Sequence, residues 1–317
     1  MIRFYATRGH YVDHLLPIAH ALIARKVDIA FHVAPGEAFL AADRVPTVMG
    51  RPPTDDLIVV AGAQDLGSYP RAVLVEHGAG QTYVDMSQNS WAGGDGRQNV
   101  VLFIVPNQYA AAANERRYPT PNVIAAPRIE YLRSVETPEL SDLWYDVILG
   151  RHWDSHLAPE LNSAWAHHFE TLRRFALVNR NRTALHFHPR CADVGRTLAR
   201  EWYCHYFETF LGPVMHAPRG VLVIDNSSAG FEWAALDRPV VWLNAPHYRR
   251  NIEQGLRFWS HVDVGMQVDE PENLEYAIAE SLRHDPMADR RRELIADVYP
   301  VIDGAAEIAA DAIMEVV

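Results

Sequence analysis

The sequence predicts an α/β protein that consists of two doubly wound domains with parallel sheets. Short apolar runs alternate along the chain with segments of helical periodicity, a pattern typical of βαβ units. One run, Val221–Ile224, is apolar without interruption, as expected for a strand buried on both faces of a parallel sheet. A chain of 317 residues is long enough for two domains of ordinary size.

The first half of the chain contains a regular succession of expected strands and helices. Strands are expected over 2–6, 27–33, 57–61, 72–75, 100–105 and 123–126. Helices are expected over 14–24, 108–117 and 129–133, and the first has an apolar stripe that includes Leu15, Ile18 and Leu22. A polar, proline-containing stretch follows, so the N-terminal domain is placed at residues 1–135.

The second half continues the same alternation. Strands are expected over 144–149, 183–187, 221–224 and 240–243, and helices over 158–178, 191–201, 231–236, 273–282 and 290–298. This C-terminal domain spans residues 136–300. Residues 301–317 are expected to form a terminal helix that packs back on the N-terminal domain.

Composition and charge limit the partners of the protein. The formal net charge is −11, so nucleic acid and anionic membrane surfaces are not expected as main partners. The chain has two cysteines, Cys191 and Cys204, which are too few for a disulfide scaffold and favour a reduced, cytoplasmic setting. The sequence predicts no signal peptide and no transmembrane segment, and it leaves the oligomeric state open.

The stretch 221–246 combines a buried strand with polar turn residues and a short helix. Asp225, Asn226, Ser227 and Ser228 follow the strand, and Gly230 permits a close approach of the backbone. Ligands of open α/β sheets lie at the carboxyl edge of the strands, and helix amino ends attract phosphate. This stretch alone is explained equally well by a phosphate site and by an ordinary serine cap.

Several motifs resemble those of known transferases. The segment from Arg8 to Leu22 looks like the first loop and helix of GT-B glycosyltransferases. Across residues 77–317 the chain resembles the CDP-glycerol glycerophosphotransferase family, the teichoic-acid polymerase and primase type of GT-B enzyme. Five stretches carry this second resemblance in the order of the family: His77-Gly78, 125–132 (AAPRIEYL), 186–189 (HFHP), 221–239 and 303–306 (DGAA).

The chain also departs from the family at two loops. Residues 79–82 are Ala-Gly-Gln-Thr, where the family has Thr-Pro-Leu-Lys, and 150–154 (GRHWD) replaces a Thr-x-Arg loop. The basic and amphipathic membrane segments of such polymerases are missing. The acceptor, the nucleotide base and the choice between glycerol-phosphate and sugar transfer therefore stay open.

The resemblance implies two Rossmann-like domains that face each other across a cleft and a specific set of site residues. His77 is expected to act as the catalytic base for the acceptor hydroxyl, and His188 to stabilise a phosphate oxygen. The donor phosphates and nucleotide would be held by Arg128, Ser227, Ser228, Ala229, Gly230 and Glu232. Gly9, His10 and Gly78 would lie on the acceptor side. No metal and no cofactor are expected, since a nucleotide-diphosphate donor is itself the substrate.

Other histidines and tryptophans are interpreted as structural. His152 with His156, and His167 with His168, have spacings that can bind zinc, but no carboxylate or cysteine completes a set. Trp144, Trp153 and Trp165 are expected in the core. Arg249 and Arg250 are weaker candidates for the donor site, which a solvated surface would also explain.

Two alternatives to a transferase remain. A nucleotide-sugar 2-epimerase or hydrolase on the same fold would form product without an acceptor. It would need acidic residues to move a proton at carbon, and the sequence offers Glu76, Glu130 and Glu232. The other alternative is a non-catalytic nucleotide-binding module.

Overall fold

The computed structural model divides the chain into two compact units. Unit 1 comprises Met1–Tyr131 and Val298–Val317, and unit 2 comprises Leu132–Asp297. The structure describes the chain except for residues 35–44, 68, 81–93, 137–143, 155–161 and 251–257. The sequence had placed the corresponding boundaries at 135 and 300.

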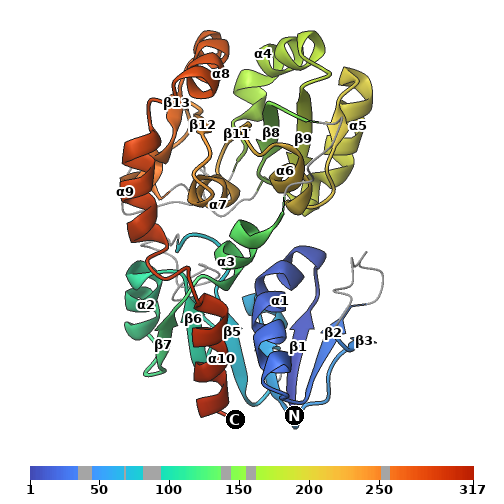
Figure 1. Ribbon diagram of the computed structural model, residues 1–317, viewed down its shortest axis with the longest axis vertical. Coiled ribbons are helices and arrows are strands. Elements are labelled where there is room, and N and C mark those ends of the chain that lie inside the picture. The colour runs from blue at the N-terminus through green and yellow to red at the C-terminus, as the bar shows by residue number, and fades with distance from the viewer. Residues whose placement is uncertain (35–44, 68, 81–93, 137–143, 155–161, 251–257) are drawn as a thin grey trace. The chain divides into compact units, whose positions relative to one another are not determined.

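Unit 1 contains a seven-stranded sheet in the order β3-β2-β1-β4-β5-β6-β7, in which every pairing is parallel. Its strands are β1 (Ile2–Ala6), β2 (Ile29–Val33), β3 (Thr47–Met49), β4 (Leu57–Val60), β5 (Ala72–Val75), β6 (Val100–Val105) and β7 (Asn122–Ile124). Its helices are α1 (Gly9–Ala24), α2 (Gln108–Glu115), α10 (Ala305–Glu315) and the first part of α3 (Pro127–Ser134), as Figure 1 shows.

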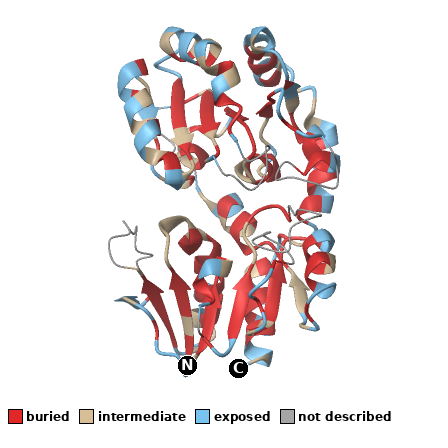
Figure 2. Ribbon diagram, turned by 180° about the vertical axis from the view of Figure 1, so that it is seen from behind, coloured by how far each residue is buried: buried red, intermediate tan, exposed pale blue. Residues whose placement is uncertain are grey.

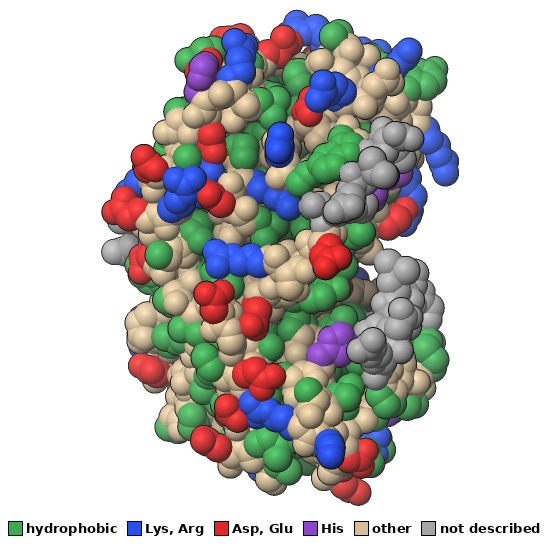
Figure 3. Space-filling model, viewed as in Figure 1, with side chains coloured by type: hydrophobic (Ala, Val, Ile, Leu, Met, Phe, Trp, Pro, Cys, Tyr) green, Lys and Arg blue, Asp and Glu red, His purple; other side chains and the backbone are tan. Residues whose placement is uncertain are grey.

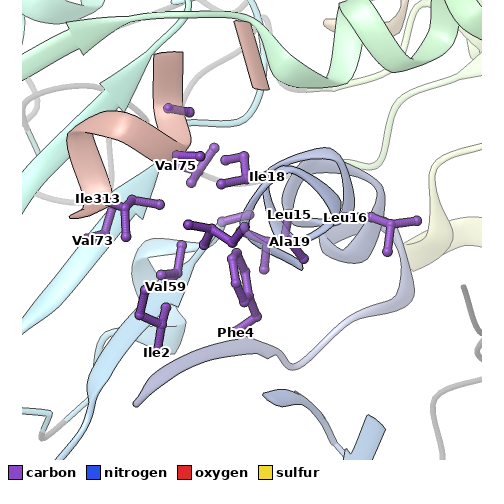
Figure 4. Close-up of a cluster of buried hydrophobic side chains, with 14 of the residues drawn as sticks. Ile2, Phe4, Leu15, Leu16, Ile18, Ala19, Val59, Val73, Val75 and Ile313 are labelled. Carbon is purple, nitrogen blue, oxygen red and sulfur yellow. The ribbon is translucent and has the colours of Figure 1, made fainter. Parts of the chain in front are cut away.

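Alternate residues of the unit 1 strands pack on opposite faces of the sheet, because successive side chains of a strand point to opposite sides. Phe4 and Val59 pack with α1 and α10, where Leu15 and Ile313 are fully buried (Figure 4). Tyr5, with Ile58 and Phe103 among others, belongs to the core on the other face, which α2 covers. The sheet is therefore doubly wound, and the terminal helix forms part of its core.

Unit 2 contains a six-stranded parallel sheet in the order β10-β9-β8-β11-β12-β13. Its strands are β8 (Val147–Arg151), β9 (Thr183–Phe187), β10 (His205–Tyr206), β11 (Val221–Ile224), β12 (Val240–Leu243) and β13 (Met266–Val268). Its helices are α4 (Trp165–Val178), α5 (Ala192–Trp202), α6 (Leu211–His216), α7 (Ala229–Ala235), α8 (Leu274–Arg283) and α9 (Ala288–Val298). In Figure 2 the central strands of each unit are buried, and the helices around them are exposed on their outer faces.

The strand order in each sheet reverses direction at one place. In unit 1 the reversal lies between β1 and β4, and in unit 2 it lies between β8 and β11. Ligands of doubly wound sheets bind at the carboxyl ends of the strands beside such a switch point. The loops that follow these four strands are therefore where a site is sought.

The structure confirms the predicted α/β class and corrects several element boundaries. The helix expected from His14 begins at Gly9, so Gly9 and His10 form its first turn and are not part of a loop. The strand expected over 144–149 is shifted to Val147–Arg151. The short strands β3, β10 and β13 were missed, because segments of two or three residues contain no apolar run from which they could be predicted.

Candidate functional site

His77 lies at the carboxyl end of β5, and the switch-point loop after β4 holds its ring. Its Nδ1 atom is 2.7 Å from the carbonyl oxygen of Ala61. A carbonyl oxygen only accepts hydrogen bonds, so Nδ1 carries the proton and the lone pair of the neutral ring lies on Nε2. The next residue, Gly78, has a φ of +101°, which explains why glycine occupies this position.

Two aromatic rings contact His77 within unit 1. Its ring centroid is 5.1 Å from that of Tyr11 and 5.9 Å from that of His14. Burial lowers the pKa of His77, and with the opposing effect of the bond to Ala61 and the charges of Arg97 and Arg128 the pKa is about 4. His77 is thus neutral at pH 7, in the form in which imidazole accepts a proton.

Arg128 lies close to His77 and to the first helix of the chain. It is 8% exposed, and its Nη1 atom is 3.4 Å from Oδ2 of Asp13. Burial raises the pKa of Asp13 in spite of this pairing. Burial and then the charge of Arg128 keep the pKa of His14 well below its usual value. We call His10, Asp13, His14, His77 and Arg128 the unit 1 cluster.

The predicted acceptor-side residues belong to the same edge of unit 1. The His10 ring packs against Tyr11, with centroids 4.2 Å apart, and Gly9 precedes it in the first turn of α1. The structure therefore brings His10, Arg128 and His77 together within one unit. Arg128 was predicted to face the donor, and its position in the cluster leaves that role a prediction.

Two of the acidic residues considered for epimerase chemistry have structural partners. Glu76 forms an ion pair with Arg97, which is 1% exposed and also donates to Asn114 Oδ1 at 3.2 Å. The two carboxylate oxygens of Glu130 accept from the amides of Gly304 and Ala306, each at 2.8 Å. Glu130 thus caps the amino end of α10. These bonds join two of the family-like motifs, a contact that could not be predicted from the sequence.

In unit 2, His188 lies at the carboxyl end of β9 with a defined tautomer. Its Nδ1 atom accepts a hydrogen bond from the amide of Arg190 at 3.2 Å, within the short turn that Pro189 begins. The proton of the neutral ring is therefore on Nε2. Its ring centroid is 5.5 Å from that of His152 and 6.1 Å from that of Trp153.

The turn after β11 is organised by Asp225, which the sequence had suggested only as a turn residue. Its buried carboxylate accepts from the amide of His152 at 2.7 Å and from Ser163 Oγ at 2.5 Å. Asp225 therefore joins the loops after β8 and β11 across the switch point.

Some polar groups of the predicted phosphate site, the turn 227–230, form hydrogen bonds within that turn. Ser227 Oγ accepts from the amide of Ala229, and its carbonyl oxygen accepts from the amide of Gly230, each at 3.2 Å. Ser228 is the N-cap residue of α7, but its side chain makes no capping bond. Glu232, in the first turn of α7, is 4% exposed.

Packing explains the glycine at position 230, where the sequence predicted a close approach of the backbone. A Cβ atom there would lie 2.2 Å from the ring of Trp242. The close approach is therefore that of Trp242, and the expected role of Gly230 in holding the donor phosphate stays a prediction.

The remaining aromatic predictions were partly right. Trp165 is buried and stacked on Trp202, whereas Trp144, which precedes β8, is 41% exposed. Trp153 is only partly buried, and the Arg190 guanidinium carbon lies 4.0 Å from its ring centroid.

The structure also shows the contacts of His168 and Arg250, which the sequence analysis had considered for a metal site and for the donor site. His168 is buried and its Nε2 atom bonds to the Asn244 carbonyl oxygen at 2.7 Å, which confirms a structural role. Arg250 pairs with Asp269 on the surface. His156 lies outside the described residues. Within the described part of the chain, no group of three or more histidine, cysteine, aspartate or glutamate side chains is arranged to hold a metal.

No family model and no curated protein matches this sequence. Solved structures match both units of the chain. The wall teichoic acid polymerase TagF is 14% identical, with a TM-score of 0.64 over 99% of this chain and 88% of that one. A Listeria monocytogenes protein provisionally assigned as a UDP-N-acetylglucosamine 2-epimerase is 14% identical, with a TM-score of 0.63 over 99% of this chain and 94% of that one.

A third similar structure is the Methanocaldococcus jannaschii UDP-GlcNAc 2-epimerase in complex with UDP-GlcNAc and UDP. It is 12% identical, with a TM-score of 0.58 over 93% of this chain and 99% of that one. These likenesses, together with the two parallel-sheet units, show that the chain has the GT-B fold. The fold is common to the polymerase and the epimerases, so it does not choose between their activities.

Proposed function

We propose that this protein is a transferase that moves a glycerol-phosphate or glycosyl group from a nucleotide-activated donor to a hydroxyl acceptor. The main support is that His77 and His188, each at the carboxyl edge of its sheet, have different neutral tautomers. His77 donates through Nδ1 to Ala61, and His188 accepts at Nδ1 from Arg190. The Nε2 atom of His77 therefore has a lone pair, whereas that of His188 has a proton.

These forms suit the two proton tasks of group transfer. In glycerophosphotransfer, His77 Nε2 takes the proton of the acceptor hydroxyl, whose oxygen forms a bond to the phosphorus that bears glycerol. The bridging P–O bond breaks and the nucleoside monophosphate leaves, with His188 Nε2–H donating to a phosphate oxygen. In glycosyl transfer the same oxygen attacks the anomeric carbon, and a nucleoside diphosphate leaves.

Of the three acidic residues offered for the epimerase alternative, the third, Glu232, is 4% exposed in the first turn of α7. The partners of the other two favour a transferase. Moving a proton at carbon needs an acid or base that is available to the sugar. Glu76 is paired with buried Arg97, and Glu130 caps α10. In the unit 1 cluster the acidic side chain is Asp13, which is paired with Arg128.

The surface and helices agree with a small-molecule substrate. On the face drawn in Figure 3, acidic and basic side chains are interspersed and no continuous basic surface is visible. Among the described helices, none has the length and apolar character to cross a bilayer. We therefore propose a nucleotide-diphosphate donor and no nucleic-acid partner.

The test is to incubate the protein with CDP-glycerol and, separately, with common nucleotide sugars, each with and without hydroxyl acceptors. Anion-exchange chromatography then identifies the nucleotide released. Release of CMP indicates glycerophosphotransfer, and acceptor-dependent release of a nucleoside diphosphate indicates glycosyl transfer. A C2-epimerised or hydrolysed product without acceptor would show the alternative enzyme, and binding without any turnover would show a non-catalytic module.

A further inference from the structure

His152 occupies the switch point of unit 2, between the elements that the proposed donor site uses. It directly follows β8, and the register pairs Arg151 with Phe187, so His152 and His188 leave neighbouring strands at the same level. Their ring centroids are 5.5 Å apart. On the other side, the His152 amide donates to Asp225 at the start of the turn after β11.

The two ring nitrogens of His152 are buried without hydrogen-bond partners among the described residues. The ring is 2% exposed, and within the described part of the chain neither Nδ1 nor Nε2 has a hydrogen-bond partner. The backbone of Trp153 is near enough to favour the charged ring slightly, but it makes no hydrogen bond of normal geometry. A buried polar group without a partner is destabilising, and a ligand atom that bonds to it would remove that cost.

Other buried histidines of unit 2 are bonded. His168 contacts the Asn244 carbonyl oxygen at 2.7 Å, and His261 Nε2 lies 2.6 Å from Asp297 Oδ2. Packing in this unit therefore does not leave every histidine without a partner. His152 differs from them, and it lies at the sheet edge where doubly wound proteins bind ligands.

The charges around His152 favour an anion. Burial lowers its pKa to about 4, and the charges of Arg190 and Arg151 act in the same direction, opposed by Asp154. The ring is therefore neutral at pH 7, with one N–H to donate to an oxygen of a bound phosphate. The nearby guanidinium groups add attraction for the same phosphate.

We propose that His152 is a donor-binding residue whose ring N–H bonds to a phosphate oxygen of a nucleoside diphosphate held at the ends of β8 and β11. The inference rests on the proposed function and adds a contact to it. The ring centroids of Trp153 and His152 are 5.5 Å apart, and the Arg190 guanidinium lies over the Trp153 ring.

Isothermal titration with CDP and with UDP tests the proposal. We expect His152→Ala to weaken the Kd about 10- to 100-fold, the loss of one hydrogen bond to a charged group, and His152→Asn to restore part of it. His167→Asn is the matched control, because the His167 ring already contacts the Asp269 carbonyl oxygen at 3.0 Å, and it should leave the Kd unchanged. A folded His152→Ala variant with the wild-type Kd would overturn the proposal.

A measurement on the wild-type protein covers the case in which the variants fail to fold. The ring ¹⁵N signals of His152, assigned by their absence in His152→Asn or by sequential NMR, should shift when CDP or UDP saturates the protein. Unchanged signals at saturation contradict the contact. If the wild-type protein binds neither nucleotide, the proposed function fails as well, whereas equal binding by wild type and His152→Ala removes only the role of His152.

Discussion

The Nδ1 atom of His77 donates a 2.7 Å hydrogen bond to the carbonyl oxygen of Ala61. Ala61 directly follows β4 at the unit 1 switch point, and His77 lies two residues beyond the end of β5. The bond therefore fixes both the orientation and the tautomer of the ring from the neighbouring loop. It leaves Nε2 as the nitrogen that can take a proton.

Replacing His77 should remove turnover without removing the fold. His77→Ala is expected to lower kcat about 10²- to 10⁴-fold, the usual contribution of a positioned general base. The measurement is the rate of nucleotide release, with circular dichroism to show folding. His20→Ala, a change at an exposed residue of the same helix-bearing unit, should retain full activity. Full activity in His77→Ala would remove this residue from the mechanism.

The pH profile should report the lowered pKa of His77. A base works in its neutral form, and burial holds the pKa of this ring at about 4. Lowering the pH through 6.5 should therefore leave kcat/KM almost unchanged, and the acid limb should appear near the lower value. An acid limb at the ordinary histidine pKa of about 6.5 would show that another histidine is the base.

The contact between Gly230 and Trp242 predicts a stability effect. Gly230→Ala should lower the free energy of unfolding by about 1–3 kcal/mol, because the new methyl group overlaps the indole. In a double-mutant cycle measured by urea unfolding, Trp242→Phe should reduce this cost by making room. Additive effects of the two changes would contradict the packing explanation.

We expect Ser227 to contribute to stability and Ser228 to donor binding. Ser227 Oγ accepts from the Ala229 amide, so Ser227→Ala should cost about 0.5–2 kcal/mol of stability. The Ser228 side chain makes no capping bond, so Ser228→Ala should leave the Tm nearly unchanged and weaken donor affinity. Thermal melts and titration with nucleoside diphosphate measure the two effects. Wild-type affinity in Ser228→Ala would count against a phosphate role.

The carboxylate cap on α10 predicts a further stability change. Glu130→Ala should destabilise unit 1 by about 1–2 kcal/mol, since it removes both acceptors of the Gly304 and Ala306 amides. Glu130→Gln keeps one acceptor oxygen and should cost less. Hydrogen exchange of the α10 amides is the direct measurement, and unchanged exchange in Glu130→Ala would show that the cap is dispensable. Glu115→Ala, at the exposed end of α2, is the control.

The repeating parts of the fold could be predicted from local sequence. Central strands such as β4 and β11 are continuous apolar runs, since helices cover both faces of the sheet. Edge strands such as β10, with only His205 and Tyr206, lack that signal. Their place depends on pairing with β9, which is a tertiary contact.

The site was predicted less completely, for a similar reason. Sequence motifs indicated His77 and His188 because both follow strands in a family-like order. The role proposed for His152 could not be predicted from the sequence, because it depends on the absence of a hydrogen-bond partner in the folded environment. At Gly230 the sequence predicted a close approach but not the group that makes it, because Trp242 lies twelve positions away in the sequence.

Unit 2 is inserted into unit 1 along the chain, because Val298–Val317 completes the unit that Met1 begins. During synthesis on the ribosome, the core around Leu15 must wait for Ile313, which is translated after the whole of unit 2. Unit 2 can fold before that moment, while unit 1 still lacks a helix. A truncated product that ends before α10 would therefore expose the apolar side of a sheet, which makes it a ready substrate for chaperones and proteases.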